Sequence, residues 1–363
     1  MSKTNTDSGN DQQAPFVLSK RRVDEDVQTS AAEKPKRKLT HEDYTEGWIC
    51  PLEVEQIPAM VMLDEEHERL PQASTDHNVY NLGSIAGHNV VIAGLHETGN
   101  NPAATVVTQM RMTFPKLKFG LLVGIGGGVP VKTDEGMIRL GHVVVSRPAN
   151  GHSGAVQYNR GKAKVDLFER TGALAPPPAV LLNAARELAV QRSMADTDPL
   201  EGNFQRINTK KRGLRKYKHP GMSKDHLYKA DYIHLNPELS CDECGCDPSQ
   251  QIPRPTDDGD DDDEQWIVVH RGTIASGDLV VKDAAVRDNL AKQYGLLCFE
   301  MEAVGALTDF PCIVIRGISD YCDSHKNDQW HGYAAAVAAA YARQLFFHMP
   351  VDEVKRYVLA SDR

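Results

Sequence analysis

The sequence predicts a single α/β domain in which helices cover both faces of a central sheet and one long insertion interrupts the pattern. Apolar runs of strand length alternate with segments of helical spacing, first over residues 46–195 and again over 265–348. Strands that alternate with helices are typical of such a covered sheet. With 363 residues and 40% hydrophobic composition, the chain can form one large core.

Each element is predicted from its own pattern. A short strand after Gly47 runs into a proline-marked turn and the start of a helix. Further strands are predicted at 85–95, 118–130, 140–146, 266–278, 296–299 and 311–320. Helices are predicted at 101–114, after an Asn-Pro start, at 177–191, after prolines, and at 331–349.

The segments outside this pattern are polar. Residues 1–43 are charged and poor in aromatic residues, so we expect a disordered tail. Its residues 20–38 hold two basic clusters that resemble a bipartite nuclear-import signal, although a solvated charged tail explains them as well. Residues 195–264 are expected to be a partly disordered insertion, and 351–363 a C-terminal tail. The core domain is therefore expected to span 44–350.

Composition excludes several classes of protein. A net charge of −9 argues against nucleic-acid binding. No apolar run approaches the ~18 residues of a membrane span, and the first residues lack a signal peptide. Seven cysteines, several of them within apolar runs, fit a reduced compartment. We expect a cytoplasmic or nuclear protein.

A glycine-rich segment, "VGIGGGVP" at 123–130, follows a buried strand. Val129 stands where a dinucleotide fingerprint needs its last glycine, and no Lys-Ser/Thr pair completes a phosphate loop. Gly126 and Gly127 can still let a ligand approach backbone N–H groups. A Gly-x-Ser-x-Gly nucleophile motif is absent from the sequence.

A cysteine cluster, "CDECGC", lies within the insertion. Cys241 and Cys244 have a zinc-like Cys-x-x-Cys spacing, and Cys246 follows. A structural site needs four ligands, however, and the nearest histidines, His219 and His234, lie upstream at irregular distances. An ordinary loop with reduced thiols is the simpler interpretation, and we expect no metal.

Acidic residues follow three predicted strands. Glu55 comes after the first strand, Glu300 and Glu302 flank a methionine after a middle strand, and Asp320 ends the run "CIVIRGISD". Each alone could be a cap or a solvated acid. Together they are harder to dismiss, and a binding site for hydroxyl groups would explain acids at the ends of buried strands. We expect burial to keep Asp320 protonated near neutral pH.

These motifs carry a resemblance. The order of "GWICPLEVEQ", "VGIGGGVP", "LGHVVVS", "IASGD", "CFEMEA" and "IRGISD" resembles the nucleoside phosphorylase/nucleosidase superfamily. The chain is similar to the 5′-methylthioadenosine/S-adenosylhomocysteine nucleosidases, and more so to nucleoside-phosphorylase-like domains of fungal multidomain proteins. The resemblance implies a central mixed, twisted sheet and a homo-oligomer.

The resemblance also implies residue roles. Glu302 would hold ribose hydroxyls, with Met301 against the sugar and Glu300 beside them. Asp320, next to Ser319, would support protonation of the base, and Glu55 would activate water. The remaining predicted contacts are Val280 and Val281 to the base, Gly126 and Gly127 at the strand end, and Lys282 to a 5′-phosphate chain.

The predicted activity is hydrolysis of a purine nucleoside or nucleotide, with adenine as the base and ATP as one possible substrate, and without a cofactor. Water is favoured over phosphate because the glycine-rich segment holds no arginine, although Arg139, Arg147 and Arg316 remain possible phosphate partners. The alternatives are a phosphate-dependent phosphorylase and a sensor that binds a nucleoside without turnover.

Overall fold

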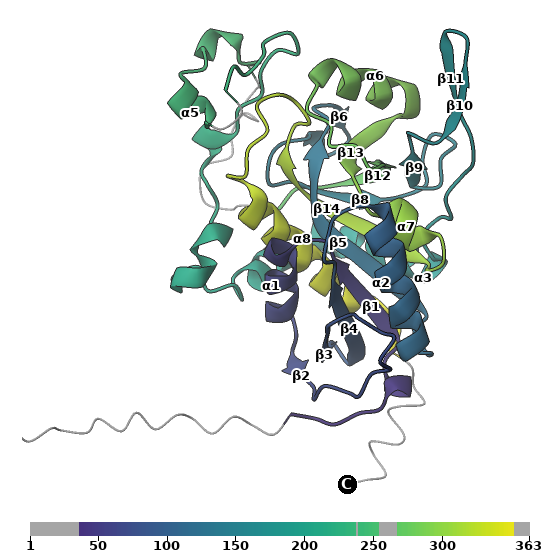
Figure 1. Ribbon diagram of the computed structural model, residues 1–363. Helices are drawn as coiled ribbons and strands as arrows, with labels where there is room; N and C mark the ends of the chain where they lie inside the picture. Colours follow the sequence, from purple (N-terminus) through teal and green to yellow (C-terminus); the bar gives the residue numbers. More distant parts are fainter. Residues whose placement is uncertain (1–35, 237–238, 254–266, 352–363) are drawn as a thin grey trace, which may run out of the picture. The chain divides into compact units, whose positions relative to one another are not determined.

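A mixed, ten-stranded sheet forms the centre of the described chain (Figure 1). The computed structural model describes residues 36–236, 239–253 and 267–351. The strand order is β13-β12-β8-β14-β5-β1-β4-β3-β2, with β9 beside β12. β5 is parallel to β1 and β14, whereas β14 is antiparallel to β8. The predicted α/β fold with a mixed sheet is therefore confirmed.

The strands of this sheet are β1 (Glu46–Cys50), β2 (Glu65–Glu66), β3 (Tyr80–Ile85), β4 (His88–Gly94), β5 (Phe119–Gly128), β8 (Val143–Ser146), β9 (Ala155–Gln157), β12 (Val269–Ser276), β13 (Leu296–Glu300) and β14 (Cys312–Asp320). Two separate hairpins pair β6 (Lys132–Thr133) with β7 (Gly136–Met137) and β10 (Gly161–Lys164) with β11 (Leu167–Arg170).

The α-helices are α1 (Glu53–Val61), α2 (Asn100–Thr113), α3 (Ala179–Met194), α4 (Pro199–Phe204), α5 (Cys241–Cys244), α6 (Ala284–Tyr294), α7 (Ala303–Leu307) and α8 (His331–Phe346). Four short 3₁₀ helices are η1 (His41–Asp43), η2 (Arg212–Tyr217), η3 (Met222–Lys224) and η4 (Pro248–Gln250). The predicted strands and helices are present. Outside the insertion, no element had been predicted for β2, β3, β6, β7, β9, β10, β11, α6 and α7.

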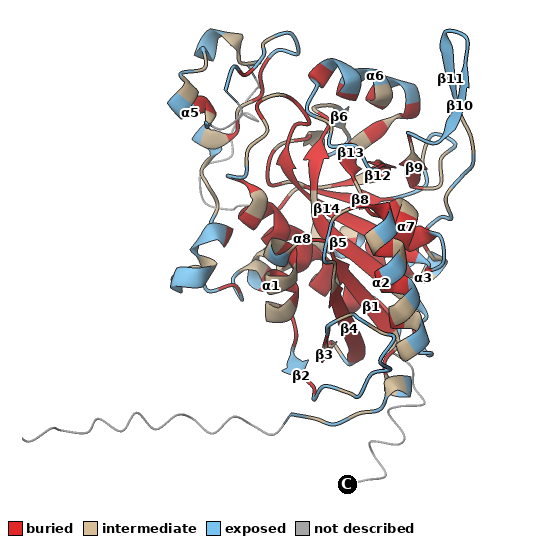
Figure 2. Cartoon of the chain, viewed as in Figure 1, coloured by how far each residue is buried: buried red, intermediate tan, exposed pale blue. Residues whose placement is uncertain are grey.

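Helix α8 is the most deeply buried helix of the domain (Figure 2). Its alanine-rich sequence lets it pack closely on β5 and β14, and α1, α3 and α4 contact it in turn. Helices α2 and α7 pack against each other elsewhere on the sheet. Helices thus cover the central strands β5 and β14, whose residues are almost all buried.

The sheet curls until β13 meets β5. β13 pairs with β12 along one edge and with β5 along the other, where Cys298 and Phe299 lie opposite Gly128 and Gly127. A ring of strands β5-β14-β8-β12-β13 results. This closure brings the acidic end of β13 beside the glycine-rich end of β5 and the last residues of β14.

Much of the predicted insertion is ordered. Within 195–236 and 239–253 the structure describes α4, α5 and three 3₁₀ helices, and α4 and η2 contact α8. Buried side chains without a regular period, such as Leu200, Ile207 and Tyr217, anchor these segments, which explains why sequence patterning did not reveal them. The acidic run at 257–264 lies outside the described residues.

Part of the expected N-terminal tail has a described structure. Residues 36–43, assigned to the tail, hold a bridge between Arg37 and His67 and the 3₁₀ helix η1. The first basic cluster, at residues 20–22, lies outside the described residues, as do 352–363 of the expected C-terminal tail, whereas Lys36, Arg37 and Lys38 of the second cluster are described. No helix in the described ranges is both long and apolar enough to cross a membrane.

The glycine-rich strand predicts a stability test. A Cβ atom at Gly124 would clash with Glu55 Oε1 and Arg316 Nη1, both of which are buried and unable to move freely. We expect Gly124→Ala to lower the free energy of unfolding by about 1–3 kcal/mol in urea denaturation. Gly202→Ala is the control, because Gly202 lies exposed in α4 with open space around it. Equal stability of both variants would contradict the tight packing around Gly124.

Candidate active site

One cavity of about 230 Å³ collects most of the residues predicted to form the site. It lies where α1, β5, β13 and β14 meet the segment after β12. Its wall includes Pro51, Leu52, Glu55, Thr98, Ile125, Gly126, Gly127, Leu279, Val280, Val281, Phe299, Glu300, Met301, Glu302, Arg316, Ser319, Cys322, Lys326 and His331. A larger hollow of about 630 Å³ between α3 and β12 contains none of the predicted site residues.

Arg316 is the centre of a buried charge cluster on this wall. It lies within β14, and its side chain is 1% exposed. Nη2 donates to Glu300 Oε2 at 2.6 Å and to Glu302 Oε2 at 3.1 Å, and Nη1 lies 4.0 Å from Glu55 Oε1. Buried carboxylates are tolerated when a cation and further hydrogen bonds compensate the lost water. Arg316 therefore explains how two glutamates can flank Met301 at the end of a buried strand.

Backbone amides hold the two glutamates of β13 and α7. Glu300 accepts from the N–H groups of Glu302 and Ala303, so its carboxylate fixes the turn into α7. Glu302 Oε1 accepts from Gly99 N at 3.0 Å, just before α2. Burial, reinforced by Glu300, raises the pKa of Glu302, and Arg316 opposes this rise. Glu300 thus fixes the backbone of the site, whereas the carboxylate of Glu302 links the start of α2 to Arg316 on β14.

Glu55 is held in the first turn of α1. Its Oε2 accepts from Leu52 N at 2.6 Å, as an acid three residues into a helix commonly does, and Oε1 accepts from Ile125 N at 2.7 Å. Burial raises the pKa of Glu55 to about 8, although Arg316 and these amides favour the anion. A carboxylate with this pKa can take up a proton near neutral pH, as a general base requires.

Asp320, at the end of β14, is fully hydrogen-bonded. Oδ2 accepts from Lys326 Nζ at 2.7 Å and from Ser319 Oγ at 2.9 Å, and Oδ1 accepts from Cys322 N at 2.9 Å. Burial alone raises the pKa of Asp320, but the Lys326 ammonium and these bonds outweigh it and hold the pKa below its usual value. The expectation that burial keeps Asp320 protonated is therefore wrong for this structure.

Lys326 carries the proton at this end of the cavity. Burial lowers its pKa, but pairing with Asp320 dominates, and the pKa lies above its usual value. Lys326 lines the cavity. Asp320 is not part of the wall and is hydrogen-bonded to two residues that are, Lys326 and Ser319. Lys326 was not among the predicted site residues, and its only signal in the sequence was a basic residue in the polar stretch that follows the strand.

The other predicted residues fall into two groups. Gly126, Gly127, Val280, Val281, Met301 and Ser319 line the cavity. The N–H of Ile125, within the same glycine-rich strand, is already bonded to Glu55. Lys282 is exposed and is not part of the wall. Arg316, which was considered as a phosphate partner, is paired with glutamates. The wall also contains four residues that the sequence did not indicate: Thr98, Phe299, Cys322 and His331.

The fold is that of the nucleoside phosphorylases and nucleosidases. Residues 248–346 match the family model described as the phosphorylase superfamily. A nucleotide-binding leucine-rich repeat (NLR)-like protein of Hyaloscypha variabilis is 39% identical over 332 residues, which are 88% of this chain and 30% of that protein. Over residues 248–346 the chain therefore matches the phosphorylase superfamily, in line with the resemblance of its motifs.

A second relative is much more distant. The ATP nucleosidase Cap17 of Escherichia coli is 38% identical over 79 residues, which are 20% of this chain and 16% of that protein. The chain thus spans less than a third of the length of either relative.

Solved structures share the fold at low identity. Futalosine hydrolase of Helicobacter pylori has a TM-score of 0.53 and 17% identity, over 84% of this chain and 98% of that one. The 5′-methylthioadenosine/S-adenosylhomocysteine nucleosidase of Helicobacter pylori has a TM-score of 0.53 and 16% identity, over 83% and 97%. The corresponding nucleosidase of Neisseria meningitidis has a TM-score of 0.51 and 16% identity, over 84% and 99%. At such identities the likeness concerns the fold.

The pKa of Glu55 predicts a pH-dependent stability. Below pH ~4.5 the carboxyl is protonated in both the folded and the unfolded state. As the pH rises toward 8 the unfolded state releases this proton first, so stability is lost. We expect the free energy of unfolding of Glu55→Gln, relative to wild type, to rise by up to a few kcal/mol between pH 5 and pH 8.

Urea denaturation at pH 5, 6.5 and 8 measures this difference. Glu53→Gln is the matched control, because Glu53 is an exposed acid on the same helix. Its pH dependence should follow that of wild type. A constant difference between Glu55→Gln and wild type would show that Glu55 titrates normally.

Proposed function

We propose that this domain is a purine N-ribosyl hydrolase, which cleaves the N-glycosidic bond of an adenine nucleoside or nucleotide with water and releases the free base. The observation that carries the proposal is the buried cluster of Glu55, Glu300 and Glu302 around Arg316, on the same cavity wall as Lys326, the partner of Asp320.

The negative charge of the cluster matches the positive charge that would develop on the sugar. Breaking the C–N bond leaves positive, oxocarbenium-like charge on the ribose. Three carboxylates around one guanidinium place an excess of negative charge on this wall once the glutamates ionise. In the proposed complex Glu302 accepts hydrogen bonds from ribose hydroxyls, which a charged acceptor binds more strongly than a neutral one. Met301 offers an apolar contact to the sugar beside it.

The Asp320–Lys326 pair suits the leaving base. A departing purine anion needs a proton, and Lys326 is the protonated member of the pair. In the proposed step the proton passes from Lys326 Nζ to the base, while the Asp320 carboxylate holds the ammonium in position. Lys326 then regains a proton from solvent. Leu279, Val280 and Phe299 provide an apolar part of the wall for the flat ring.

Water is the proposed nucleophile. Among the described residues of the wall, the Lys and Arg side chains are Arg316 and Lys326, and both are paired with carboxylates. Arg139 and Arg147 do not line the cavity. A phosphate dianion would therefore meet carboxylates rather than a free cation, whereas Glu55 can take a proton from water and release it to solvent afterwards.

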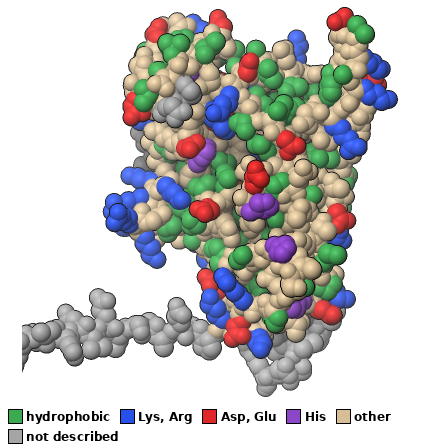
Figure 3. All heavy atoms as spheres, viewed as in Figure 1, with side chains coloured by type: hydrophobic (Ala, Val, Ile, Leu, Met, Phe, Trp, Pro, Cys, Tyr) green, Lys and Arg blue, Asp and Glu red, His purple; other side chains and the backbone are tan. Residues whose placement is uncertain are grey.

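A nucleotide substrate is supported by a basic surface near α1. Figure 3 shows Lys and Arg side chains gathered over one flank of the visible face. The segment around η2 contributes exposed Lys210, Lys211, Arg212, Arg215, Lys216 and Lys218. The segment is tied to α1, because Tyr217 Oη donates to the carbonyl of Val54 at 3.1 Å. The name of the relative Cap17 makes ATP the nucleotide to test first.

A panel of substrates tests the proposal. Purified protein is incubated with adenosine, methylthioadenosine, AMP, ATP and guanosine, with and without phosphate, and free base and sugar products are separated by chromatography. We expect adenine and a sugar product whose anomeric carbon carries no phosphate, formed equally with and without added phosphate. Ribose 1-phosphate as product would establish a phosphorylase instead. Binding measured by calorimetry without base release would establish a binding domain.

The proton donor is tested by two substitutions. Asp320→Asn and Lys326→Met should each lower kcat for base release by about 10²–10⁴-fold and leave KM within a few-fold, because a lost proton donor acts on the transition state. Lys292→Met is the control, since Lys292 is exposed on α6. Full activity of Lys326→Met with loss in Asp320→Asn would show that Asp320 alone protonates the base.

A further inference from the structure

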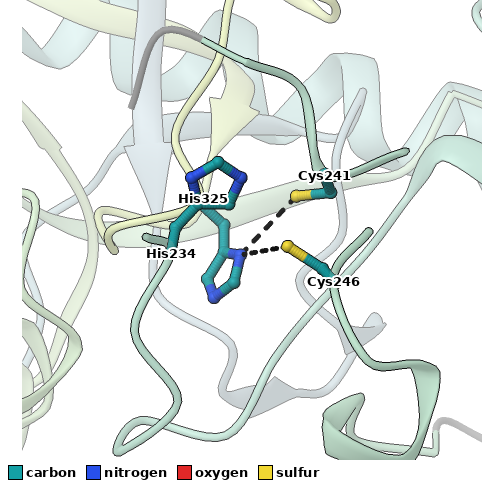
Figure 4. A group of neighbouring side chains, drawn as sticks. All are labelled: His234, Cys241, Cys246 and His325. Atoms are coloured by element: carbon teal, nitrogen blue, oxygen red, sulfur yellow. Dashed lines mark hydrogen bonds between the residues drawn. The ribbon is translucent and has the colours of Figure 1, made fainter. Parts of the chain in front are cut away.

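A second group of side chains, remote in sequence, meets beside the active site. His234, Cys241 and Cys246 come from the insertion, and His325 comes from the segment that follows β14. Each offers one ligand atom, and these atoms all lie within 4.8 Å of one another. Figure 4 shows both sulfur atoms directed toward the His325 ring, with His234 alongside.

The His325 ring is oriented as a metal ligand. Its Nε2 donates to the backbone carbonyl of Tyr232 at 3.0 Å, which leaves the lone pair on Nδ1. Nδ1 lies 3.5 Å from Cys241 Sγ and 3.9 Å from Cys246 Sγ. Histidines that bind metals usually donate their other N–H to a carbonyl or carboxylate in this way.

The distances match a tetrahedral zinc site. With Zn–S bonds of about 2.3 Å and Zn–N bonds of about 2.0–2.1 Å, a sulfur and a nitrogen on neighbouring corners lie about 3.6 Å apart. The two Sγ–Nδ1 distances are close to this edge. Small adjustments of side chains would therefore suffice to bind an ion.

His234 supplies an independent observation. The residue is 8% exposed, and neither ring nitrogen has a hydrogen-bond partner among the residues that the structure describes. A buried polar atom without a partner costs about 1–3 kcal/mol. Its backbone is fixed, because His234 N donates to Ser324 Oγ at 3.0 Å. A metal ion would satisfy the nitrogen that faces the cluster.

We propose that His234, Cys241, Cys246 and His325 bind one structural Zn²⁺ ion. Two thiolates and two imidazoles are a donor set that favours zinc, and four protein ligands leave no open position for catalysis. The ion would join the insertion to residues 321–326, the segment that carries Lys326. From the sequence no metal was expected, because Cys241, Cys244 and Cys246 had only His219 and His234 nearby, at irregular distances. The structure adds His325 from a remote segment and leaves Cys244 outside the group.

Metal analysis of the full-length protein tests the site. The protein is purified without chelators, equilibrated with Zn²⁺, freed of unbound metal and measured by mass spectrometry of the elements. We expect about one zinc per chain in wild type and in the control Cys244→Ser. The double variant Cys241→Ser/Cys246→Ser should hold less than about a tenth of that amount.

Cobalt substitution keeps the test decisive if the double variant fails to fold. Wild type loaded with Co²⁺ should show thiolate-to-cobalt charge-transfer absorption, and His325→Ala should change this spectrum. Cys244→Ser should leave it unchanged. Absence of zinc and of that absorption in wild type would overturn the proposal. Equal loss in Cys244→Ser, or a Cys241–Cys246 disulfide found by mass spectrometry without reductant, would overturn it as well.

Discussion

The arrangement of the site depends on one buried guanidinium. Arg316 projects from the central strand β14 and binds carboxylates that come from α1, from the end of β13 and from the start of α7. Each partner is almost fully buried, so removal of Arg316 would leave three carboxylates without a counter-charge, and breaking a buried ion pair typically costs about 3–5 kcal/mol. The same pairing that stabilises this junction also concentrates the acids that the proposed reaction needs. The stability of this junction and the proposed stabilisation of the sugar therefore depend on the same four side chains.

Glycines allow these elements to come so close. Gly124 leaves room for Glu55 and Arg316, and Gly127 leaves room for Cys322 and Asp320. From its sequence, the glycine-rich strand was expected to be a surface that a ligand approaches. Gly126 and Gly127 do line the cavity, but the space above Gly124 is filled by protein side chains. The main constraint on this strand is thus the closure of β13 and β14 around it.

Local pattern predicted the elements well, because burial imposes a period on each strand and helix separately. The strands β4, β5, β8, β12 and β14 and the helices α2, α3 and α8 follow from such patterns. The residues that contact one another across the sheet cannot be predicted from such patterns, because these contacts depend on how the sheet closes. Sequence order alone could not reveal that Arg316 meets Glu55, that Lys326 reverses the expected protonation of Asp320, or that His325 joins Cys241. Spacing also misled, since Cys-x-x-Cys drew attention to Cys244.

The insertion holds in place the segment that follows β14. Tyr321 Oη donates to Asp225 Oδ1 at 2.7 Å, and the indole of Trp330 donates to the carbonyl of Lys224 at 3.1 Å, so the insertion holds the segment after β14 on both sides of Lys326. Arg287 Nη1 adds a bond to the Tyr321 carbonyl from α6. A lysine that must deliver a proton has to stay within hydrogen-bond reach of its carboxylate, and a segment fixed at several points provides this positioning. The proposed zinc ion would be one more fixed point, at the residue directly before Lys326.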